Sequence, residues 1–543
     1  MKVTQAVAAA LSEAGVDHLF GLLGSGNFLV ANELAARGVR FVASRHETGA
    51  VTMADAYARV SGRLGVSTVH QGPGLTNAMT GLAEAAKSRT PLLVLAADTS
   101  AAAVRSNFRI DQAALVASVG AIPERLNSPV TAVADALRAA RRARAERRPV
   151  VLMMPLDIQS AESPTMEIEV SAQLSPTRPD GQSITEIVRR IERARRPLII
   201  GGRGAVLAGA GTHLEELASA IGALLATSAV ANGLFAGNPW SLGILGSFTS
   251  PFAVDLIAQA DLVLAFGASL NMWTTRHGKL FASDSVIVQV DDRPEALGAD
   301  HRVDLAIVAD AAETARDVRA AISRTQNRWR QSDLPDRIRQ GKWRYQPYAD
   351  GGTERTIDPR TFSIALDDVL PSNRAVAIDS GHFMGYPLMY IGVESADAFI
   401  FTQGFQSIGL GLATAIGAAV ARPDRITVAA LGDGGALMAA SEFETAARLR
   451  LPVLIVVYND AAYSAEVHHF APMGEPVDLV QFPDTDFVAL GRAFDIGGVT
   501  VRVRNDLLAV REWAAQAATP FVVDAKVEPT VVDSWLEEAF RGH

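Results

Sequence analysis

The sequence predicts an α/β fold in which three doubly wound domains each contain a parallel sheet. Short apolar runs of strand length alternate with helix-length segments, as in repeated strand–helix–strand units. The chain has 543 residues, which is too long for one hydrophobic core. Linker-like stretches at 160–180 and 327–358 divide it. We therefore predict domains at 1–165, 181–325 and 345–543.

Composition narrows the classes of function. The chain is 49% hydrophobic and 20% charged with a net charge of −9, which argues against nucleic acid as a partner. It has no cysteine, so disulfides, thiolate catalysis and cysteine-ligated metals are excluded. Glu13 and Asp17 interrupt the N-terminal apolar stripe, and no stretch is long enough to span a membrane. We expect a cytoplasmic protein without a membrane partner.

In the first block, polar residues follow the predicted strands. A helix at about 4–14 precedes a strand at 18–23 and the turn Gly24-Ser25-Gly26. Arg45-His46-Glu47 lies between a short strand and a helix at about 48–60. A further strand, 65–70, ends at His70 before a glycine-rich turn. Two more apolar strands are expected at 91–97 and 149–155.

The middle block repeats the pattern without an obvious catalytic motif. Its predicted strands near 197–201, 261–270 and 285–292 are apolar. Gly201-Gly202-Arg203-Gly204 could cradle a nucleotide, but a GGxG stretch alone is weak evidence for a cofactor site.

The third block carries the strongest motif. A strand at 426–431 leads into Gly432-Asp433-Gly434-Gly435, and one helix is predicted from 436 to 449. The next strand, from 453, ends at Asn459-Asp460. Glycine N–H groups at a helix start suit phosphate, and Asp433 and Asp460 place hard oxygens at the ends of neighbouring strands. The residues thus predict a diphosphate site with Mg²⁺.

This motif resembles the signature of thiamine-diphosphate (ThDP) enzymes. Asp460 stands where that signature usually has a second Asn, which keeps an oxygen ligand and adds negative charge. The resemblance implies that Asp433, Asp460 and the backbone carbonyl of Ala462 bind the metal. It also implies the domain order pyrimidine, central and diphosphate. The other residues implied to bind the coenzyme in this domain are Gln403, Gly404, Gln406, Ile408, Gly432, Gly434, Gly435 and Tyr463.

Two stretches of the first block extend the resemblance. Residues 45–59 resemble the segment in which a glutamate, here Glu47, hydrogen-bonds the pyrimidine ring and activates the coenzyme. Residues 71–77 resemble the GPGxTN turn of acetolactate synthase-like enzymes, which implies that Pro73 and Asn77 contact the coenzyme. The alternative for Glu47 is an acid that only stabilises its helix N-terminus.

Other residues are implied to act on the substrate. His70 aligns with a catalytic histidine of benzoylformate decarboxylase-like members, although a structural histidine is the alternative. Ser25 matches a residue that faces the substrate carboxylate, and Glu466 has the offset of a catalytic glutamate in pyruvate decarboxylase-like members. The predicted substrate-binding residues are Gln71, Arg109, Arg276, His277, His468 and His469.

Two departures weaken the acetolactate synthase assignment and argue against flavin. Leu156 stands where flavin-bearing synthases often have Lys, and Phe108-Arg109 replaces their Phe-Gln. Arg276 lies in a stretch resembling their RxxGxL segment, which keeps FAD as an alternative cofactor.

The leading hypothesis is a ThDP- and Mg²⁺-dependent enzyme that decarboxylates a small 2-oxo acid and performs carboligation. A simple decarboxylase that releases an aldehyde is one alternative, and a non-catalytic ThDP-fold subunit is the other. The resemblance implies a homodimer as the minimum active unit, or a homotetramer, because the coenzyme would lie between the first domain of one subunit and the third of another.

Overall fold

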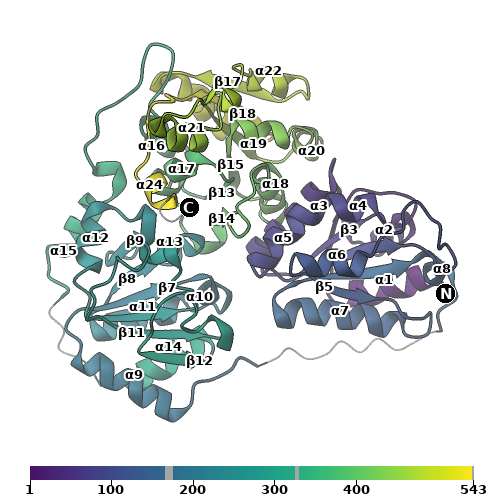
Figure 1. Cartoon of the computed structure of the whole chain (residues 1–543), viewed down its shortest axis with the longest axis horizontal. Coiled ribbons are helices and arrows are strands. Elements are labelled where there is room, and N and C mark those ends of the chain that lie inside the picture. The colour runs from purple at the N-terminus through teal and green to yellow at the C-terminus, as the bar shows by residue number, and fades with distance from the viewer. Residues whose placement is uncertain (165–174, 324–328, 541–543) are drawn as a thin grey trace.

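The computed structural model describes residues 1–164, 175–323 and 329–540. It contains three six-stranded sheets whose strands are all parallel, each flanked by helices (Figure 1). This confirms the predicted α/β class with three doubly wound sheets. The central strands of each sheet are apolar runs because both faces of a parallel sheet are covered by helices.

The first sheet has the strand order β2-β1-β3-β4-β6-β5. Its strands are β1 (His18–Gly21), β2 (Arg40–Ala43), β3 (Gly65–Val69), β4 (Leu92–Asp98), β5 (Ile122–Arg125) and β6 (Pro149–Pro155). Its helices are α1 (Val3–Glu13), α2 (Phe28–Ala35), α3 (Glu47–Ser61), α4 (Pro73–Asn77), α5 (Met79–Lys87), α6 (Gln112–Ser118), α7 (Ala132–Glu146) and α8 (Leu156–Ser160).

The middle sheet has the order β12-β11-β10-β7-β8-β9. Its strands are β7 (Pro197–Gly201), β8 (Leu224–Thr227), β9 (Ser241–Ile244), β10 (Leu262–Phe266), β11 (Val286–Asp291) and β12 (Leu305–Val308). Its helices are α9 (Gly181–Arg193), α10 (Arg203–Leu207), α11 (Gly211–Ile221), α12 (Pro251–Ile257), α13 (Met272–Thr275), α14 (Ala311–Ala321) and α15 (Leu334–Gln340), with short turns η1 (Ala229–Ala231), η2 (Gly246–Phe248), η3 (Pro294–Ala296) and η4 (Trp343–Tyr345).

The third sheet, β14-β13-β15-β16-β18-β17, repeats the connectivity of the first. Its strands are β13 (Arg374–Ile378), β14 (Phe399–Phe401), β15 (Ile426–Gly432), β16 (Val453–Asn459), β17 (Gly497–Val501) and β18 (Phe521–Lys526). Its helices are α16 (Pro359–Val369), α17 (Gly385–Tyr390), α18 (Gly411–Ala421), α19 (Asp433–Met438), α20 (Glu442–Leu449), α21 (Ser464–Phe470), α22 (Phe487–Arg492), α23 (Leu508–Ala514) and α24 (Trp535–Ala539), with short turns η5 (His382–Met384), η6 (Ala396–Ala398), η7 (Ala471–Met473), η8 (Asp478–Val480) and η9 (Arg504–Leu507).

Three local predictions need correction. The single helix expected over 436–449 is two helices, α19 and α20, because the chain turns at 439–441 and Glu442 N–H bonds to Ala439. Strand β5 escaped prediction because Pro123 and two charged residues interrupt its apolar pattern. The expected linker 327–358 contains α15, which buries Leu334 and Ile338 in the core of the middle domain. Within the other linker, residues 165–174 lie outside the described part.

The first and third domains share one hydrophobic core. Helix α3 packs along α18 where the two lobes meet in Figure 1. A Cβ on Gly417 of α18 would overlap the backbone carbonyl of Met53 in α3, so the two helix backbones touch directly. This contact joins the first and third domains.

None of the helices in the described ranges combines the length and the apolar character that crossing a bilayer requires.

Candidate functional site

Two buried carboxylates lie at the carboxyl ends of adjacent strands in the third domain. Asp433 follows β15, Asp460 follows β16, and the two strands pair in parallel. Burial and the nearby charge of Asp460 raise the pKa of Asp433 to about 7. Burial raises the pKa of Asp460 to about 6. Two desolvated acids that repel each other form a site that a divalent cation would stabilise.

The glycine turn beside this pair is packed tightly. A Cβ on Gly434 would overlap the ring of Tyr463, and a Cβ on Gly435 would come 2.5 Å from Oδ2 of Asp379. The backbone N–H of Gly434 donates to Asp433 Oδ1 at 2.8 Å. The turn is therefore held close to the acid pair from two sides, and only glycine fits there.

The residues after β16 separate into inward and outward positions. Asn459 points inward, and its amide donates to Asp524 Oδ1 at 2.9 Å. Asp460 points to the strand end and accepts the Ser464 hydroxyl at 2.6 Å. Ala461 has a left-handed φ of 57°, which turns the chain so that Ala462 follows directly beside the acid pair. Asn459 therefore faces the protein interior, whereas Asp460 lies at the strand end near Asp433.

The loop that contains Gln403, Gly404, Gln406 and Ile408 is held at both ends by carboxylates. Oδ2 of Asp379 accepts the N–H of Gly409 at 2.9 Å. Burial raises the pKa of Asp379 to about 6, and the backbone N–H donors around it oppose that rise. Gln406 has a φ of 62°, and both it and Gly404 are exposed. The middle of this loop thus presents its residues outward.

In the first domain, Glu47 is the first residue of α3 and is 8% exposed. The side-chain amide of Asn77 donates to its Oε2 at 3.1 Å, and Oε1 lies beside the turn that contains Gly74. The structure therefore brings together Glu47 and the predicted GPGxTN turn, in which Pro73 and Asn77 are exposed.

Ser25 and His70 meet at the ends of neighbouring strands β1 and β3. Ser25 Oγ lies 3.4 Å from His70 Nε2, while His70 Nδ1 lies 2.8 Å from the carbonyl of Gln71. The His70 ring packs edge-on against Phe108, with ring centroids 5.0 Å apart. Gln71 is buried, and its Oε1 fills the space beside Gly26. This pair could transfer a proton at the domain edge.

The predicted substrate residues fall into separate groups. Arg109 is exposed in a loop near His70. Arg276 donates to Glu538 Oε1 in α24 at 2.9 Å, and His277 Nε2 lies 3.0 Å from the carbonyl of Glu538. No hydrogen bond in the described ranges joins Glu47 or His70 to the acid pair of the same chain.

The region after Asp460 also meets the C-terminal segment. His469 stacks on Phe540 with ring centroids 3.9 Å apart, whereas Glu466 is exposed. His468 lies 4.6 Å from the ring of His382. Burial, reinforced by His468, lowers the pKa of His382 to about 3, so this histidine is neutral at physiological pH.

Several residues at these sites were missed by sequence reasoning. Asp379 and His382 follow β13, and Glu84 and Glu442 accept backbone N–H groups across the domain boundary. The available signal was an acid among buried apolar residues: Glu84 follows Gly81-Leu82-Ala83, and Glu442 precedes Phe443. Among the described residues, no cluster of three or more His, Cys, Asp or Glu could hold a metal ion, so any metal here relies on two carboxylates and other oxygens.

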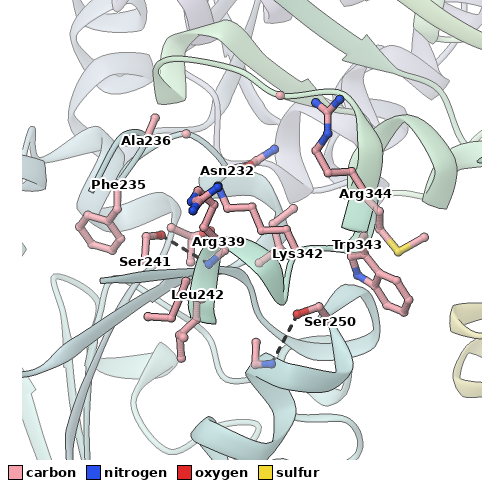
Figure 2. A pocket seen from close by; sticks show the side chains of 18 of the residues that line it. Asn232, Phe235, Ala236, Ser241, Leu242, Ser250, Arg339, Lys342, Trp343 and Arg344 are labelled. Carbon is pink, nitrogen blue, oxygen red and sulfur yellow. Dashed lines mark hydrogen bonds between the residues drawn. The ribbon is translucent and has the colours of Figure 1, made fainter. Parts of the chain in front are cut away.

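One cavity lies away from all predicted site residues. Its volume is about 600 Å³, and residues of both the middle and the third domain line it (Figure 2). Phe235 and Leu242 line one side, and Arg339, Lys342 and Trp343 line the other.

The glycine-rich turn 201–204 packs against the middle sheet. A Cβ on Gly202 or Gly204 would overlap the backbone at Gly267. The cavity beside Gly204 and Asp291 measures about 10 Å³. The guanidinium of Arg203 is buried and reaches Thr90 Oγ1 in the first domain at 3.4 Å, and burial lowers its pKa to about 9. In this conformation the turn serves packing between domains.

Comparison with known proteins assigns all three domains. Residues 1–115 match the description "Thiamine pyrophosphate enzyme, N-terminal TPP binding domain". Residues 184–318 match the central domain of the same enzymes, and residues 379–525 match their C-terminal TPP binding domain.

Full-length relatives agree with this assignment. A probable acetolactate synthase large subunit of Methanocaldococcus jannaschii is 25% identical, covering 97% of this chain and 92% of the relative. A sulfoacetaldehyde acetyltransferase of Rhodobacter capsulatus is 27% identical over 98% of each chain. A probable 2-ketoarginine decarboxylase of Pseudomonas aeruginosa is 30% identical, covering 93% of this chain and 89% of the relative. The chain therefore belongs to the ThDP-dependent enzymes and is of the acetolactate synthase-like type.

Proposed function

We propose that this enzyme uses ThDP and Mg²⁺ to decarboxylate a small 2-oxo acid and to join the retained fragment to a second carbonyl compound. The observation that carries the proposal is the buried Asp433–Asp460 pair beside the glycine turn. These carboxylates and the carbonyl of Ala462 would hold the cation, and Gly434 and Gly435 would face the diphosphate.

When bound, ThDP supplies an electron sink that accepts the electrons released with CO₂. The chain's own residues would orient it and move protons. Glu47, which Asn77 positions, would exchange a proton with the pyrimidine ring. Gln403, Gln406 and Ile408 would support the coenzyme rings from the loop held by Asp379. Tyr463 would fix the metal-side turn through its contact with Gly434.

Substrate contacts are proposed for two regions. Ser25, Gln71 and Arg109 would meet the carboxylate of the 2-oxo acid from the first domain. From the other region, the candidates are Arg276, His277, Glu466, His468 and His469. Arg276 already binds Glu538, so a substrate carboxylate would have to compete with that ion pair.

A simple decarboxylase is the second candidate. The Ser25–His70 pair favours it, because a proton donor at that position would release an aldehyde. Two of the relatives described above are named for a synthase and a transferase, and the third for a decarboxylase. Product analysis separates the candidates: acetoin- or acetolactate-type products support ligation, and aldehyde alone contradicts it.

We also propose that the active unit is at least a homodimer. Large apolar side chains are exposed beside the site loops of both domains, namely Phe28, Leu29 and Phe108 in the first and Phe405, Leu437, Met438 and Met473 in the third. A second copy would cover these surfaces and bring Glu47 of one subunit to the acid pair of the other. Light scattering with and without ThDP and Mg²⁺ tests this arrangement, and an active monomer would contradict it.

The first experiment measures CO₂ release from pyruvate and from larger 2-oxo acids, with ThDP and Mg²⁺ supplied. In Glu47→Gln we expect release to fall by about 10²–10⁴-fold, because proton exchange with the coenzyme is lost. Glu13→Gln, which changes an exposed acid of the same domain, is the matched control and should leave release unchanged. An equal rate in wild type and Glu47→Gln would remove Glu47 from the mechanism.

A further inference from the structure

A buried glutamate of the first domain holds a backbone loop of the third. Glu84, on α5, is 1% exposed. Its carboxylate accepts the N–H of Gly404 at 3.2 Å and the N–H of Phe405 at 2.7 Å. These two donors directly precede Gln406, whose left-handed φ turns the loop toward Ile408. The anchor therefore acts on the segment proposed to support the coenzyme rings.

A buried glutamate of the third domain makes the reciprocal contact. Glu442, the first residue of α20, is 2% exposed. Its Oε1 accepts the N–H of Arg45 and the N–H of His46, both at 3.1 Å. These donors directly precede Glu47, the proposed proton-exchanging acid. The turn between α19 and α20 is what places this carboxylate at the domain boundary.

We propose that Glu84 and Glu442 are a reciprocal pair of positioning residues: each domain uses one buried glutamate to fix, through two consecutive backbone N–H groups, the loop that the other domain presents to the coenzyme. The roles of both loops rest on the function proposed above. The contacts themselves do not depend on it, since they are geometric features of the chain.

The chemistry requires a carboxylate at each position. Two neighbouring N–H donors need two acceptor sites, and an ionised carboxylate offers acceptors only. At Glu84 the two N–H groups bond to different oxygens, so glutamine would turn an N–H₂ donor toward one of them. At Glu442 both N–H groups bond to Oε1, so glutamine would keep an acceptor there but replace a charged one by a weaker neutral one. Glycines allow the close approach: a Cβ on Gly404 would come 3.1 Å from Glu84 Oε1, and a Cβ on Gly49 would overlap Glu442.

The two anchors differ in how their charge is held. Glu84 is paired with Arg59 at 3.0 Å and also accepts the Ser88 hydroxyl at 2.7 Å. Glu442 instead accepts the Thr445 hydroxyl at 2.6 Å together with the N–H groups of Arg45 and His46. Burial raises the pKa of Glu442, whereas for Glu84 the charge of Arg59 and the donors outweigh burial and lower it.

Hydrogen exchange read by mass spectrometry tests the anchors without requiring activity. In Glu84→Gln we expect peptides covering 403–407 to exchange at least about tenfold faster, because bonds to a charged acceptor are lost. In Glu442→Gln a smaller acceleration is expected at 44–48, because a neutral oxygen replaces the charged acceptor of both N–H groups. Each variant should leave the other loop unchanged. The controls are Ser88→Ala and Glu444→Gln, which alter neighbouring side chains without removing an acceptor of the loop N–H groups.

The positioning role is read from coenzyme binding. Calorimetric titration with ThDP and Mg²⁺ should show at least about tenfold weaker binding in Glu84→Gln. Glu84→Asp, which keeps the carboxylate, should regain wild-type coenzyme affinity only if the amides of 403–407 also regain wild-type exchange rates. Faster loop exchange with unchanged coenzyme affinity and unchanged turnover would overturn the proposal. If the Gln variants do not fold, exchange in the wild type decides: unprotected Gly404, Phe405, Arg45 and His46 amides would overturn it.

The outcomes also separate this proposal from the proposed function. Accelerated exchange and weakened ThDP binding in the variants, with no 2-oxo acid decarboxylated by the wild type, would retain the anchors and reject the reaction. Normal decarboxylation in wild type and in both Gln variants would retain the reaction and reject the anchors.

Discussion

The first and third domains have the same strand connectivity, and β4 and β16 occupy the same place in the two sheets. Each strand ends next to an acid, but the surroundings of the two acids differ. In the first domain, Asp98 ends β4, and its carboxylate is paired with Arg125. In the third, Asp460 follows β16 and lies close enough to Asp433 for its charge to raise the pKa of that second acid. One acid is neutralised by an arginine of its own domain, and the other lies beside a second acid. The repeated fold thus supplies equivalent positions, and a few side chains decide whether the acid there is paired with an arginine or placed beside another acid.

Among the variants considered, Asp433→Asn should have the largest effect on coenzyme and metal binding. We expect ThDP and Mg²⁺ binding to weaken by at least about 10–100-fold, the scale seen when only outer groups of a metal site are changed. Thermal unfolding without metal should shift upward or stay the same, because a buried repulsion is removed. Titration calorimetry and thermal scans measure the two effects. Asp478→Asn, an exposed acid of the same domain, is the control. Weaker binding together with a lower metal-free Tm would contradict the repulsion.

Gly417→Ala tests the contact that holds the two domains together. The added Cβ would overlap the carbonyl of Met53, so α18 must shift from α3. We expect a loss of about 1–3 kcal/mol in the free energy of unfolding, as for overpacked cores. Gly181→Ala, where a Cβ meets open space, is the matched control. Denaturant unfolding that shows equal stability for the two variants would mean that the helices separate without cost.

The two buried glutamates should respond to pH with opposite signs. Glu84 has a folded pKa below the ordinary 4.5, so its stabilisation is present above that value and is lost as pH falls through the folded pKa. Glu442 has a folded pKa above 4.5, so its contribution is present below that value and is lost as pH rises through the folded pKa. The Tm deficit of Glu84→Gln should therefore grow with rising pH, and that of Glu442→Gln should shrink. Parallel trends would contradict the assigned pKa directions.

The smallest expected effect lies at the rim of the same boundary. Lys87 Nζ lies 5.8 Å from the centre of the Phe405 ring, and both residues are exposed. Lys87→Ala should cost about 0.5–1 kcal/mol of unfolding free energy, the range for an exposed cation–π contact. Loop exchange at 403–407 should not change. A loop that exchanges as fast as in Glu84→Gln would shift the anchoring role from the carboxylate to this rim contact.

The sequence predicted features that are encoded within one short segment. It did not predict contacts between residues that are far apart in the chain. Apolar runs and the spacing of Asp433 and Asp460 located the strands and the acid pair, because each signal lies within one strand–helix–strand unit. Glu84 contacts a loop 320 residues away, and Glu442 contacts one 397 residues away, so a single sequence gives no sign of the partners. Leu334 and Ile338 were missed for the same reason: their burial comes from the middle domain.

The two glutamate contacts can form only after most of the chain has been synthesised. Arg45 leaves the ribosome 397 residues before Glu442 is made. At about 5–20 residues per second, that interval is roughly 20–80 s. Throughout it, the loop before Glu47 lacks its acceptor, and the face of α3 lacks α18. The nascent first domain must therefore persist with an open apolar face until the last third of the chain emerges, which is the period when chaperone binding or premature association would have the most effect.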